Sequence, residues 1–396
     1  TPHFFDADSD GDQDLYVVSG GVEGNSGDSV FKDRLYLNDG NGVFVFAQEA
    51  LPNIASSGGP VTAADYDKDG DLDLFVGGRV VPGRYPETPR SQLLRNEGGR
   101  FQDVATLANL DAIGMITAAV WADTNADNWP DLVVATEWGP MQVFHNHQGT
   151  LRPVPGENLT GWWSSLAAGD LDDDGDLDLV AGNVGLNTKY KATVERPELL
   201  YYGDLDGTGK PRILEAKFEG SVCLPHRGYS CSSNAMPILR SKLTTFHSFA
   251  SKSVAAIYSD SRLEKARRFE ANTLESGIFL NDGKGQFKFS PLPRLAQAFP
   301  VFDIAIEDFT GDGKPDIYLV GNSNSPQRET GNMDGGLSLL LKGDGSGDFG
   351  PVWPSESGLV VPGSAMAVAV TDLNGDSKHD IVVSVNNGEL RAFEAQ

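Results

Sequence analysis

Five carboxylates fall within nine residues in the stretch DYDKDGDLD, which runs from Asp65 to Asp73 and leads into the apolar run LFVGG. Carboxylates held this close repel one another unless a cation lies among them. Hard cations such as calcium take six to eight oxygen ligands at about 2.3–2.6 Å, and a loop with side-chain oxygens at alternate positions and one backbone carbonyl can supply them. The stretch therefore predicts a site for a hard divalent cation.

The same spacing recurs five more times, each time ahead of an apolar run. The shared pattern is D-x-[DNT]-x-D-G-x-x-D, with glycine or another small turn former after the fifth position. We expect ligands from the side chains at positions one, three, five and nine and from the backbone carbonyl at position seven. The six predicted sites are Asp6, Asp8, Asp10, Asp12 and Asp14; Asp65, Asp67, Asp69, Asp71 and Asp73; Asp123, Asn125, Asp127, Trp129 and Asp131; Asp170, Asp172, Asp174, Asp176 and Asp178; Asp308, Thr310, Asp312, Lys314 and Asp316; and Asp372, Asn374, Asp376, Lys378 and Asp380.

Calcium is the ion that these loops favour. Magnesium would require a stricter octahedron with several waters, and zinc prefers cysteine and histidine. A single loop of this kind is readily explained as a solvated Asp/Gly turn, but six copies at matching spacing are not, so we expect about six calcium ions. A weaker copy, DLDGTGKPR from Asp204, has Thr208 and Arg212 at positions five and nine, and we expect it to bind weakly or not at all.

The elements that position the loops are short strands. Each loop lies between two apolar stretches, and a second hairpin follows, as in RLYLNDGNGVFVFA from Arg34 and GIFLNDGKGQFKFS from Gly277. Asn-Asp-Gly between alternating apolar residues is a strong hairpin signal. Two hairpins make a four-stranded antiparallel unit, and its recurrence predicts an all-β fold, a seven-bladed β-propeller formed as a single domain over residues 1–396. Alternatively, the Asp204 copy is an outer hairpin of blade four, which leaves six regular blades and one irregular one.

Two parts of the chain depart from this regular pattern. Residues 219–276 have helix-forming content without strand alternation, so we predict a partly helical insertion there. The first loop is preceded only by PHFF, and the last is followed by IVVSV and ELRAFEAQ. We therefore expect the last blade to lack one outer strand, which would leave an exposed edge for pairing with another chain.

The composition excludes several classes of function. A formal net charge of −25 argues against nucleic acid and anionic lipid as partners. No apolar run reaches eighteen residues, so we expect no transmembrane segment, and since Thr1 is not a start methionine we expect a processed or trimmed chain. Cys223 and Cys231 could close a small disulfide loop in an oxidising compartment; a metal site with His226 is the alternative, but it lacks a fourth ligand.

The loops and the strands after them resemble FG-GAP/VCBS repeats, which also occur in integrin α-chain heads. The chain is also similar to bacterial surface proteins in which such repeats precede an ASPIC/UnbV domain, through DLFVGGRVVPGRYPETPRS, GNVGLNTKYKA, LNDGKGQFKFSPLPRLAQAFP and PSESGL. The resemblance implies a calcium-stabilised propeller outside the cytoplasm, either secreted or on the cell surface. No ASPIC/UnbV-like segment follows the last repeat, so no function of that domain is carried over.

The connections that we place opposite the calcium loops carry cations and aromatic residues. Such residues could bind an anionic or sugar ligand, with arginine as a carboxylate fork and tyrosine as a stacking platform. The alternative is structural, because arginines often pair with nearby acids and aromatic residues pack between sheets. The candidate ligand residues are Arg84, Tyr85, Lys189, Tyr190 and Arg227, with Trp138, Trp162, Trp163, His226 and Arg328 in the same class of connection.

Three classes of function remain open at this point. The first is an extracellular recognition or adhesion module that binds a glycan or a surface protein. The second is a polysaccharide lyase, with a base and a cation drawn from Tyr190, Lys189, His226 and Arg227. The third is a structural subunit of an extracellular assembly. The sequence contains no nucleophile motif, phosphate loop or zinc triad, so the enzyme is less favoured than the binding module.

Overall fold

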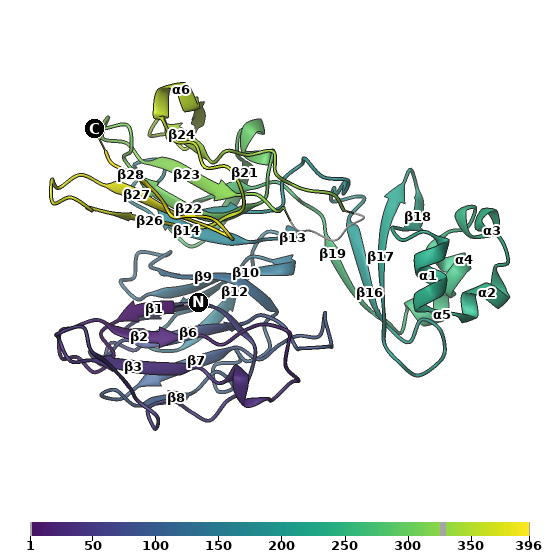
Figure 1. Ribbon diagram of the computed structural model, residues 1–396, viewed down its shortest axis with the longest axis horizontal. Helices are drawn as coiled ribbons and strands as arrows, with labels where there is room; N and C mark the ends of the chain where they lie inside the picture. The colour runs from purple at the N-terminus through teal and green to yellow at the C-terminus, as the bar shows by residue number, and fades with distance from the viewer. Residues whose placement is uncertain (1, 325–329, 396) are drawn as a thin grey trace. The chain divides into compact units, whose positions relative to one another are not determined.

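The computed structural model describes residues 2–324 and 330–395, which form seven antiparallel sheets and a few short helices (Figure 1). The chain divides into two compact units. The main unit comprises Thr1–Asn158, Trp162–Asn187 and Glu275–Gln396, and the inserted unit comprises Leu159–Gly161 and Thr188–Leu274. The sequence predicts one domain, whereas the structure has two compact units.

Six sheets, numbered 1 to 6 in chain order, belong to the main unit, except that residues 160–161 of sheet 3 are assigned to the inserted unit. Sheets 1, 2, 4 and 5 have four strands each, sheet 3 has five and sheet 6 has three. Their strands are β1 (Pro2–Phe5), β2 (Asp14–Val17), β3 (Arg34–Asn38) and β4 (Phe44–Phe46); β5 (Gly58–Ala64), β6 (Asp73–Gly78), β7 (Gln92–Asn96) and β8 (Phe101–Asp103); β9 (Met115–Ala122), β10 (Asp131–Pro140), β11 (Gln142–Asn146), β12 (Leu151–Val154) and β13 (Thr160–Trp162); β14 (Ser165–Gly169), β15 (Asp178–Gly182), β20 (Gly277–Asn281) and β21 (Phe287–Pro291); β22 (Val301–Glu307), β23 (Asp316–Gly321), β24 (Leu339–Gly343) and β25 (Phe349–Val352); and β26 (Ala365–Thr371), β27 (Asp380–Val385) and β28 (Arg391–Phe393). The short helices η1 (Ser29–Phe31), η2 (Arg294–Gln297) and α6 (Pro354–Ser357) lie in connections.

The core of the main unit lies between neighbouring sheets. The first strands of successive sheets contact one another in chain order, from β1 and β5 through β9, β14 and β22 to β26. The second strands β6, β15 and β23 are buried along their whole length because a sheet covers each face. Apolar side chains of adjacent sheets interdigitate, as Leu35 of sheet 1 does with Leu74 and Leu94 of sheet 2.

The predicted all-β class is confirmed, and the sheets have the strand order of propeller blades. The predicted count of seven blades is not confirmed, because the seventh sheet belongs to the inserted unit. Sheet 6 has three strands in the described part of the chain, which is one strand fewer than a full blade, as predicted. Its edge strand is β28.

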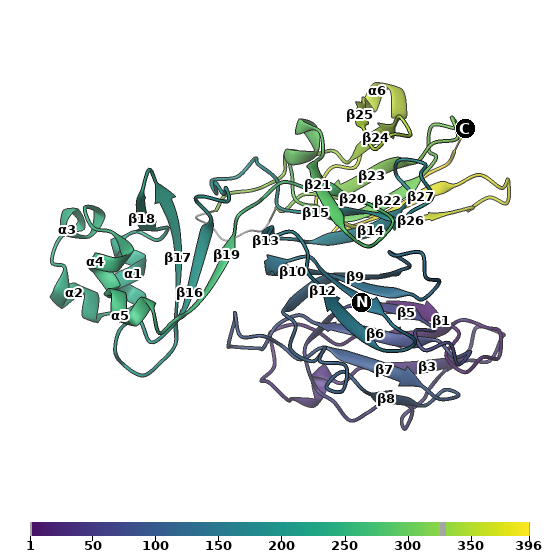
Figure 2. The ribbon, with the colours of Figure 1, turned by 180° about the vertical axis from the view of Figure 1, so that it is seen from behind.

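The inserted unit is a four-stranded sheet covered by short helices (Figures 1 and 2). It enters the chain after β15 and leaves before β20, two strands that pair directly in sheet 4. The predicted insertion spans 219–276, and the helices do fall within it, but the unit begins earlier because β16 and β17 belong to it. Its elements, with sheet order β18-β17-β16-β19, are β16 (Glu198–Gly203), β17 (Arg212–Glu219), β18 (Val222–Pro225), β19 (Arg267–Ala271), α1 (Tyr229–Ala235), α2 (Ile238–Lys242), α3 (Phe246–Ala250), α4 (Val254–Tyr258) and α5 (Asp260–Leu263).

The disulfide that the sequence leaves open is not formed. Cys223 lies on β18 and Cys231 on α1, and no bond joins their sulfur atoms. His226, the histidine of the alternative metal site, pairs with the carboxylate of Glu198. None of the helices within residues 2–324 and 330–395 has the length and apolar character needed to cross a membrane.

Candidate metal centres

Each of the six acidic loops joins the first and second strands of one sheet in the main unit. The first aspartate directly follows the end of a strand, and the ninth is the first residue of the next strand. In sheet 2, for example, Asp65 follows β5 and Asp73 begins β6, with Ala64 and Asp73 paired across the ladder. The strand pair therefore fixes both ends of every loop.

In each loop, backbone N–H groups donate hydrogen bonds to the side chains of the first and fifth residues. The first aspartate accepts hydrogen bonds from the fifth and sixth residues at 2.7–3.2 Å in all six loops. The fifth-position carboxylate accepts one from the seventh residue at 2.8–3.1 Å. The sixth residue has φ between +66° and +103°, which explains why glycine or another small residue occupies that position.

The ninth aspartate connects three strands. Its side chain is at most 1% exposed in every loop. It accepts one hydrogen bond from an N–H near the start of its loop, at 2.8–3.2 Å, and one from an N–H at or just beyond the third strand, at 2.7–3.0 Å. Burial raises the pKa of Asp73 to about 7 and that of Asp178 to about 6. A carboxylate oxygen that accepts one hydrogen bond keeps a second lone pair and can also ligate an ion. In the third loop, however, Oδ2 of Asp131 accepts both the N–H and the hydroxyl of Thr124.

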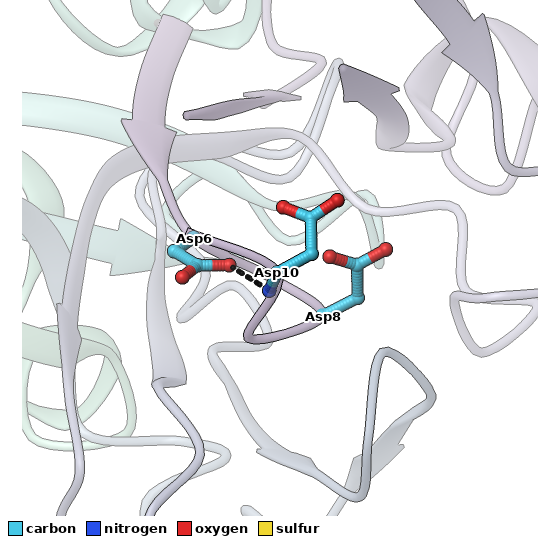
Figure 3. A group of neighbouring side chains, drawn as sticks. All are labelled: Asp6, Asp8 and Asp10. Atoms are coloured by element: carbon cyan, nitrogen blue, oxygen red, sulfur yellow. Dashed lines mark hydrogen bonds between the residues drawn. The ribbon is translucent and has the colours of Figure 1, made fainter. Parts of the chain in front are cut away.

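Carboxylate oxygens converge on one point in three of the loops. In each of these loops, three aspartates each have one carboxylate oxygen that lies within 4.8 Å of the corresponding oxygens of the other two. Figure 3 shows the first of these groups, in which the N–H of Asp10 donates to Asp6 while Asp8 lies beside Asp10. The three groups are Asp6, Asp8 and Asp10; Asp65, Asp67 and Asp73; and Asp170, Asp172 and Asp178.

The third position of these same three loops carries a buried oxygen without a hydrogen-bond partner. The atoms are Oδ1 of Asp8, Asp67 and Asp172. Burial raises the pKa of each of these carboxyls, and neighbouring aspartates raise it further. A buried acceptor that is left unpaired costs about 1–3 kcal/mol, and more when it is charged. A cation at the point of convergence would pair with these oxygens, so the donor set fits a hard divalent ion.

The other three loops have weaker donor sets. In the third loop the side-chain oxygen of Asn125 already accepts the N–H of Asp127, at 3.0 Å. In the fifth loop the Lys342 ammonium lies 2.8 Å from the carboxylate of Asp312, where it competes with an ion for a ligand. Within the described residues, no group of three acidic side chains converges in these loops. Calcium binding stays a prediction for all six loops, and the donor sets support it best in the first, second and fourth.

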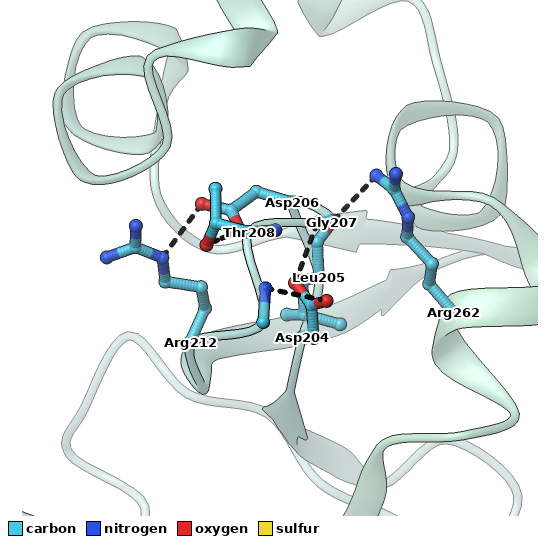
Figure 4. Close-up of polar contacts among 8 residues, drawn as sticks. Asp204, Leu205, Asp206, Gly207, Thr208, Arg212 and Arg262 are labelled. Carbon is cyan, nitrogen blue, oxygen red and sulfur yellow. Dashed lines mark hydrogen bonds and ion pairs between the residues drawn. The ribbon is translucent and has the colours of Figure 1, made fainter.

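In the loop that begins at Asp204, protein groups neutralise the third-position carboxylate (Figure 4). Arg212 stands at the ninth position and its Nε lies 2.9 Å from Oδ2 of Asp206. Thr208 stands at the fifth position and donates to Oδ1 of the same carboxylate at 2.6 Å. Burial alone would raise the pKa of Asp206, but these hydrogen bonds outweigh it and the pKa is lowered. A guanidinium and a hydroxyl therefore occupy the positions of two metal ligands.

An asparagine connection between loops was not predicted from the sequence. The amide of Asn146, the last residue of β11, donates to the carbonyl of Tyr66 in the preceding sheet's loop at 2.7 Å. Asn96 reaches the carbonyl of Ala7 and Asn281 that of Thr124, each at 2.8 Å. The signal in the sequence is an asparagine that recurs at the end of the third strand in sheets 1 to 4, but asparagine there is equally well explained as a turn former.

The residues predicted for a ligand face lie in different units. Arg84 and Tyr85 belong to the main unit. There Arg84 pairs with Glu87 at 3.2 Å, and the Tyr85 hydroxyl donates to Glu137 at 2.8 Å while accepting the Trp138 indole N–H at 2.6 Å. Both hydrogen-bonding functions of Tyr85 are thus used inside the protein. Arg328 lies outside the described residues.

Lys189, Tyr190 and Arg227 belong to the inserted unit. The Tyr190 ring is 8% exposed and lies 5.0 Å from the His226 ring, and the Lys189 ammonium lies 5.1 Å from the Tyr190 centroid. Arg227 is 3.1 Å from the carboxylate of Glu215. The structure therefore brings these three residues into one neighbourhood, around the buried His226.

Comparison with known proteins identifies the repeats. The profile of the family described as FG-GAP-like repeat matches residues 6–76, 123–181 and 271–319, which include five of the six acidic loops. No curated protein matches the sequence. The crystal structure of the V. cholerae biofilm matrix protein Bap1 is similar at 12% identity over 96% of this chain and 83% of that one, with a TM-score of 0.29. That of BBS1N in complex with ARL6DN is similar at 11% identity over 99% and 90%, with a TM-score of 0.35. At these scores neither similarity supports an argument about function.

Proposed function

We propose that the chain, three segments of which match the FG-GAP-like repeat, is a calcium-stabilised recognition or adhesion module that acts outside the cell. The role of calcium in this proposal is structural. The ions would hold the first and second strands of successive sheets together and neutralise carboxylates that the fold places side by side.

One observation carries the proposal. Asp8, Asp67 and Asp172 occupy the same position in three separate loops, and each has a buried oxygen without a partner. A solvated turn would leave these oxygens in water or give them a donor, as happens at Asp206. Three independent repetitions of an incomplete oxygen shell are best explained by an ion that completes it.

The proposed extracellular location is supported by the calcium affinity that we expect for these loops. Extracellular calcium-binding modules work at about 10⁻⁴–10⁻³ M, whereas cytosolic sites need far tighter binding. Loops that contribute mainly side-chain carboxylates on solvent-exposed turns suit the weaker range. We therefore place the protein at the cell surface or in the extracellular space.

Calorimetric titration of the decalcified protein tests the proposal. We expect at least three calcium ions to bind, and we expect calcium to raise the melting temperature because it binds the folded chain only. Asp67→Ala should remove one ion from the stoichiometry, since it removes the partnerless oxygen of the second loop.

Asp39→Ala is the matched control, because Asp39 is an exposed turn aspartate outside the loops. It should leave the stoichiometry unchanged. An identical melting curve in calcium and in excess EGTA, or an equal loss of calcium in both variants, would overturn the proposal. Self-assembly through the β28 edge and a ligand at Arg84 and Tyr85 stay predictions.

A further inference from the structure

The inserted unit is basic although the chain is acidic. Residues 159–161 and 188–274 contain 14 lysines and arginines and 9 aspartates and glutamates, a formal charge of +5. The remaining residues contain 17 lysines and arginines and 47 aspartates and glutamates, which gives a formal charge of −30. The whole-chain value of −25 therefore hides a local surface that attracts anions.

This basic unit contains a pocket of about 360 Å³ between its sheet and its helices. One wall comes from β17 and β18, the second from the turn at 226–228 and the start of α1, and the third from α3 and the residues that follow it. Every lining residue belongs to the inserted unit. The volume is in the range that small ligands occupy, and it accommodates one or two sugar rings.

An aromatic wall lines one side of the pocket. Phe246 is 67% exposed, although phenylalanine is among the residue types most often buried in folded proteins. Its ring lies 5.2 Å from that of Tyr229, which in turn lies 5.5 Å from the buried Phe249. The exposed ring of Phe246 is available to stack against the C–H surface of a sugar ring.

A histidine in the lining of the pocket pairs with a buried carboxylate. The His226 side chain is 5% exposed and pairs with Glu198, which is 2% exposed. The other oxygen of Glu198 accepts the N–H of Lys191 at 2.8 Å. His226 is therefore held in one orientation where it lines the pocket.

Cations outnumber acids at the rim. Lys217, Arg227 and Lys252 line the pocket, and Glu219 is the single carboxylate that does so among the described residues. Lys217 pairs with Glu219 at 2.7 Å, and Arg227 with Glu215 at 3.1 Å. Within the described part of the chain, the Lys252 ammonium has no acidic partner. An anionic group in the pocket would supply one.

We propose that this pocket binds an acidic glycan, with Lys252 and Arg227 on its carboxylate or sulfate groups and Phe246 and Tyr229 against a sugar ring. The combination of aromatic faces with few cations favours a sugar over a nucleic acid, whose phosphates would require a longer basic stripe. The inference names the ligand class for the recognition role proposed above and rests on that role.

The test measures binding of an oligogalacturonate and of a sulfated oligosaccharide of equal length, with a neutral galacto-oligosaccharide for comparison, by calorimetry in calcium. We expect the acidic oligosaccharides to bind and the neutral one to bind at least tenfold more weakly. Lys252→Ala should weaken binding about tenfold, since it removes a charge-assisted contact. Phe246→Ala should weaken binding of the acidic and the neutral ligand alike. Lys265→Ala is the matched control, because Lys265 is exposed in the same unit but does not line the pocket.

The outcomes separate this inference from the calcium proposal. Calcium binding without any acidic glycan binding would overturn the inference alone, as would equal losses in Lys252→Ala and Lys265→Ala. Binding of single-stranded DNA in preference to the oligosaccharides would overturn it too, as would a Lys252-dependent dimer in sedimentation without glycan binding. Glycan binding that persists in EGTA, together with no calcium uptake, would support the pocket and overturn the role of calcium.

Discussion

Asp67 and Asp206 occupy the third position of their loops, and their neighbours decide how each charge is neutralised. Asp67 has a buried oxygen without a partner and a raised pKa, because it is buried and faces other carboxylates. The hydrogen bonds to Asp206 come from Thr208 and Arg212, and its pKa is lowered. The first environment calls for an ion, and the second contains its own cation.

The Asp204 loop can be converted by two substitutions. Thr208→Asp together with Arg212→Asp restores the acidic pattern at positions five and nine, so we expect the variant to bind one more calcium ion than the wild type. Without calcium the variant should melt at a lower temperature, because the Arg212–Asp206 pair is lost from a partly buried site. Calorimetric stoichiometry and melting curves with and without EGTA measure both effects. Arg212→Ala alone serves as control; a gain of calcium there, or none in the double variant, would contradict the interpretation.

Asp33, which lies outside the acidic loops, makes a contribution to the stability of the fold that depends on pH. Burial raises its pKa, although the Ser19 N–H and the Tyr16 hydroxyl donate to it at 2.7 and 2.8 Å. A carboxyl whose folded pKa exceeds its unfolded value stabilises the fold most at low pH, and this contribution is lost as the pH rises through the folded pKa. Relative to wild type, the melting temperature of Asp33→Asn should therefore increase between about pH 4 and pH 7.

Asp39→Asn is the control of opposite sign for this measurement. N–H groups of Asn41 and Val43 lower the pKa of Asp39, so its contribution is present at neutral pH and is lost on acidification. The relative melting temperature of Asp39→Asn should therefore fall as the pH rises. Parallel trends in the two variants would show that the Asp33 environment has been misassigned.

At the scale of elements, the asparagine at the end of the third strand joins neighbouring sheets. Asn146 is fully buried, donates to the carbonyls of Tyr66 and Pro130, and accepts the N–H of Gly149. Asn146→Ala leaves these groups unpaired, so we expect a loss of about 2–4 kcal/mol in the free energy of unfolding. Urea denaturation followed by tryptophan fluorescence measures it.

Asn38 is the matched residue of sheet 1. Its amide reaches the Gln13 carbonyl at 3.2 Å, and no hydrogen bond to another sheet is present among the described residues. Asn38→Ala should therefore cost less than about 1 kcal/mol, because its groups remain accessible to water. Equal losses at Asn38 and Asn146 would show that the inter-sheet bond contributes nothing.

The sequence predicted the repeated elements well because their signals are local. The spacing from Asp65 to Asp73 indicates a loop that connects the end of one strand to the start of the next. The Asn-Asp-Gly turn of sheet 1 indicates a hairpin. Contacts between distant residues were not accessible in this way. The bond from Asn146 to Tyr66 depends on which sheets are neighbours, and the Lys342–Asp312 pair depends on strand register.

At the scale of the whole molecule, the two units have separate cores. The inserted unit buries Leu199 and Leu214 of its sheet against Leu239, Phe249 and Ile257 of its helices. Its one acidic loop is the Asp204 copy. We therefore expect two transitions in differential scanning calorimetry, and we expect EGTA to lower the temperature of the transition that belongs to the main unit only. A single transition that shifts as a whole would contradict this.

The bounds of the inserted unit could not be predicted from composition. Residues 188–218 read as repeat sequence, because Asp204 begins a loop of the familiar pattern and β16 and β17 flank it as strands. Which sheet a hairpin joins is decided by packing, and β17 pairs with β16 and β18 within the inserted unit. The helices were predictable because strand alternation stops there.

The connection between β15 and β20 has a consequence for how such a protein diversifies. Asn183, just after β15, donates its N–H to the hydroxyl of Ser276, just before β20, at 2.9 Å, so the chain departs and returns at neighbouring points. An insertion at such a point can be gained, lost or exchanged in one genetic event without moving a strand of the sheet that carries it. Selection can then act on the two units separately: substitutions that alter ligand preference accumulate in one, while the acidic loops of the other are inherited unchanged.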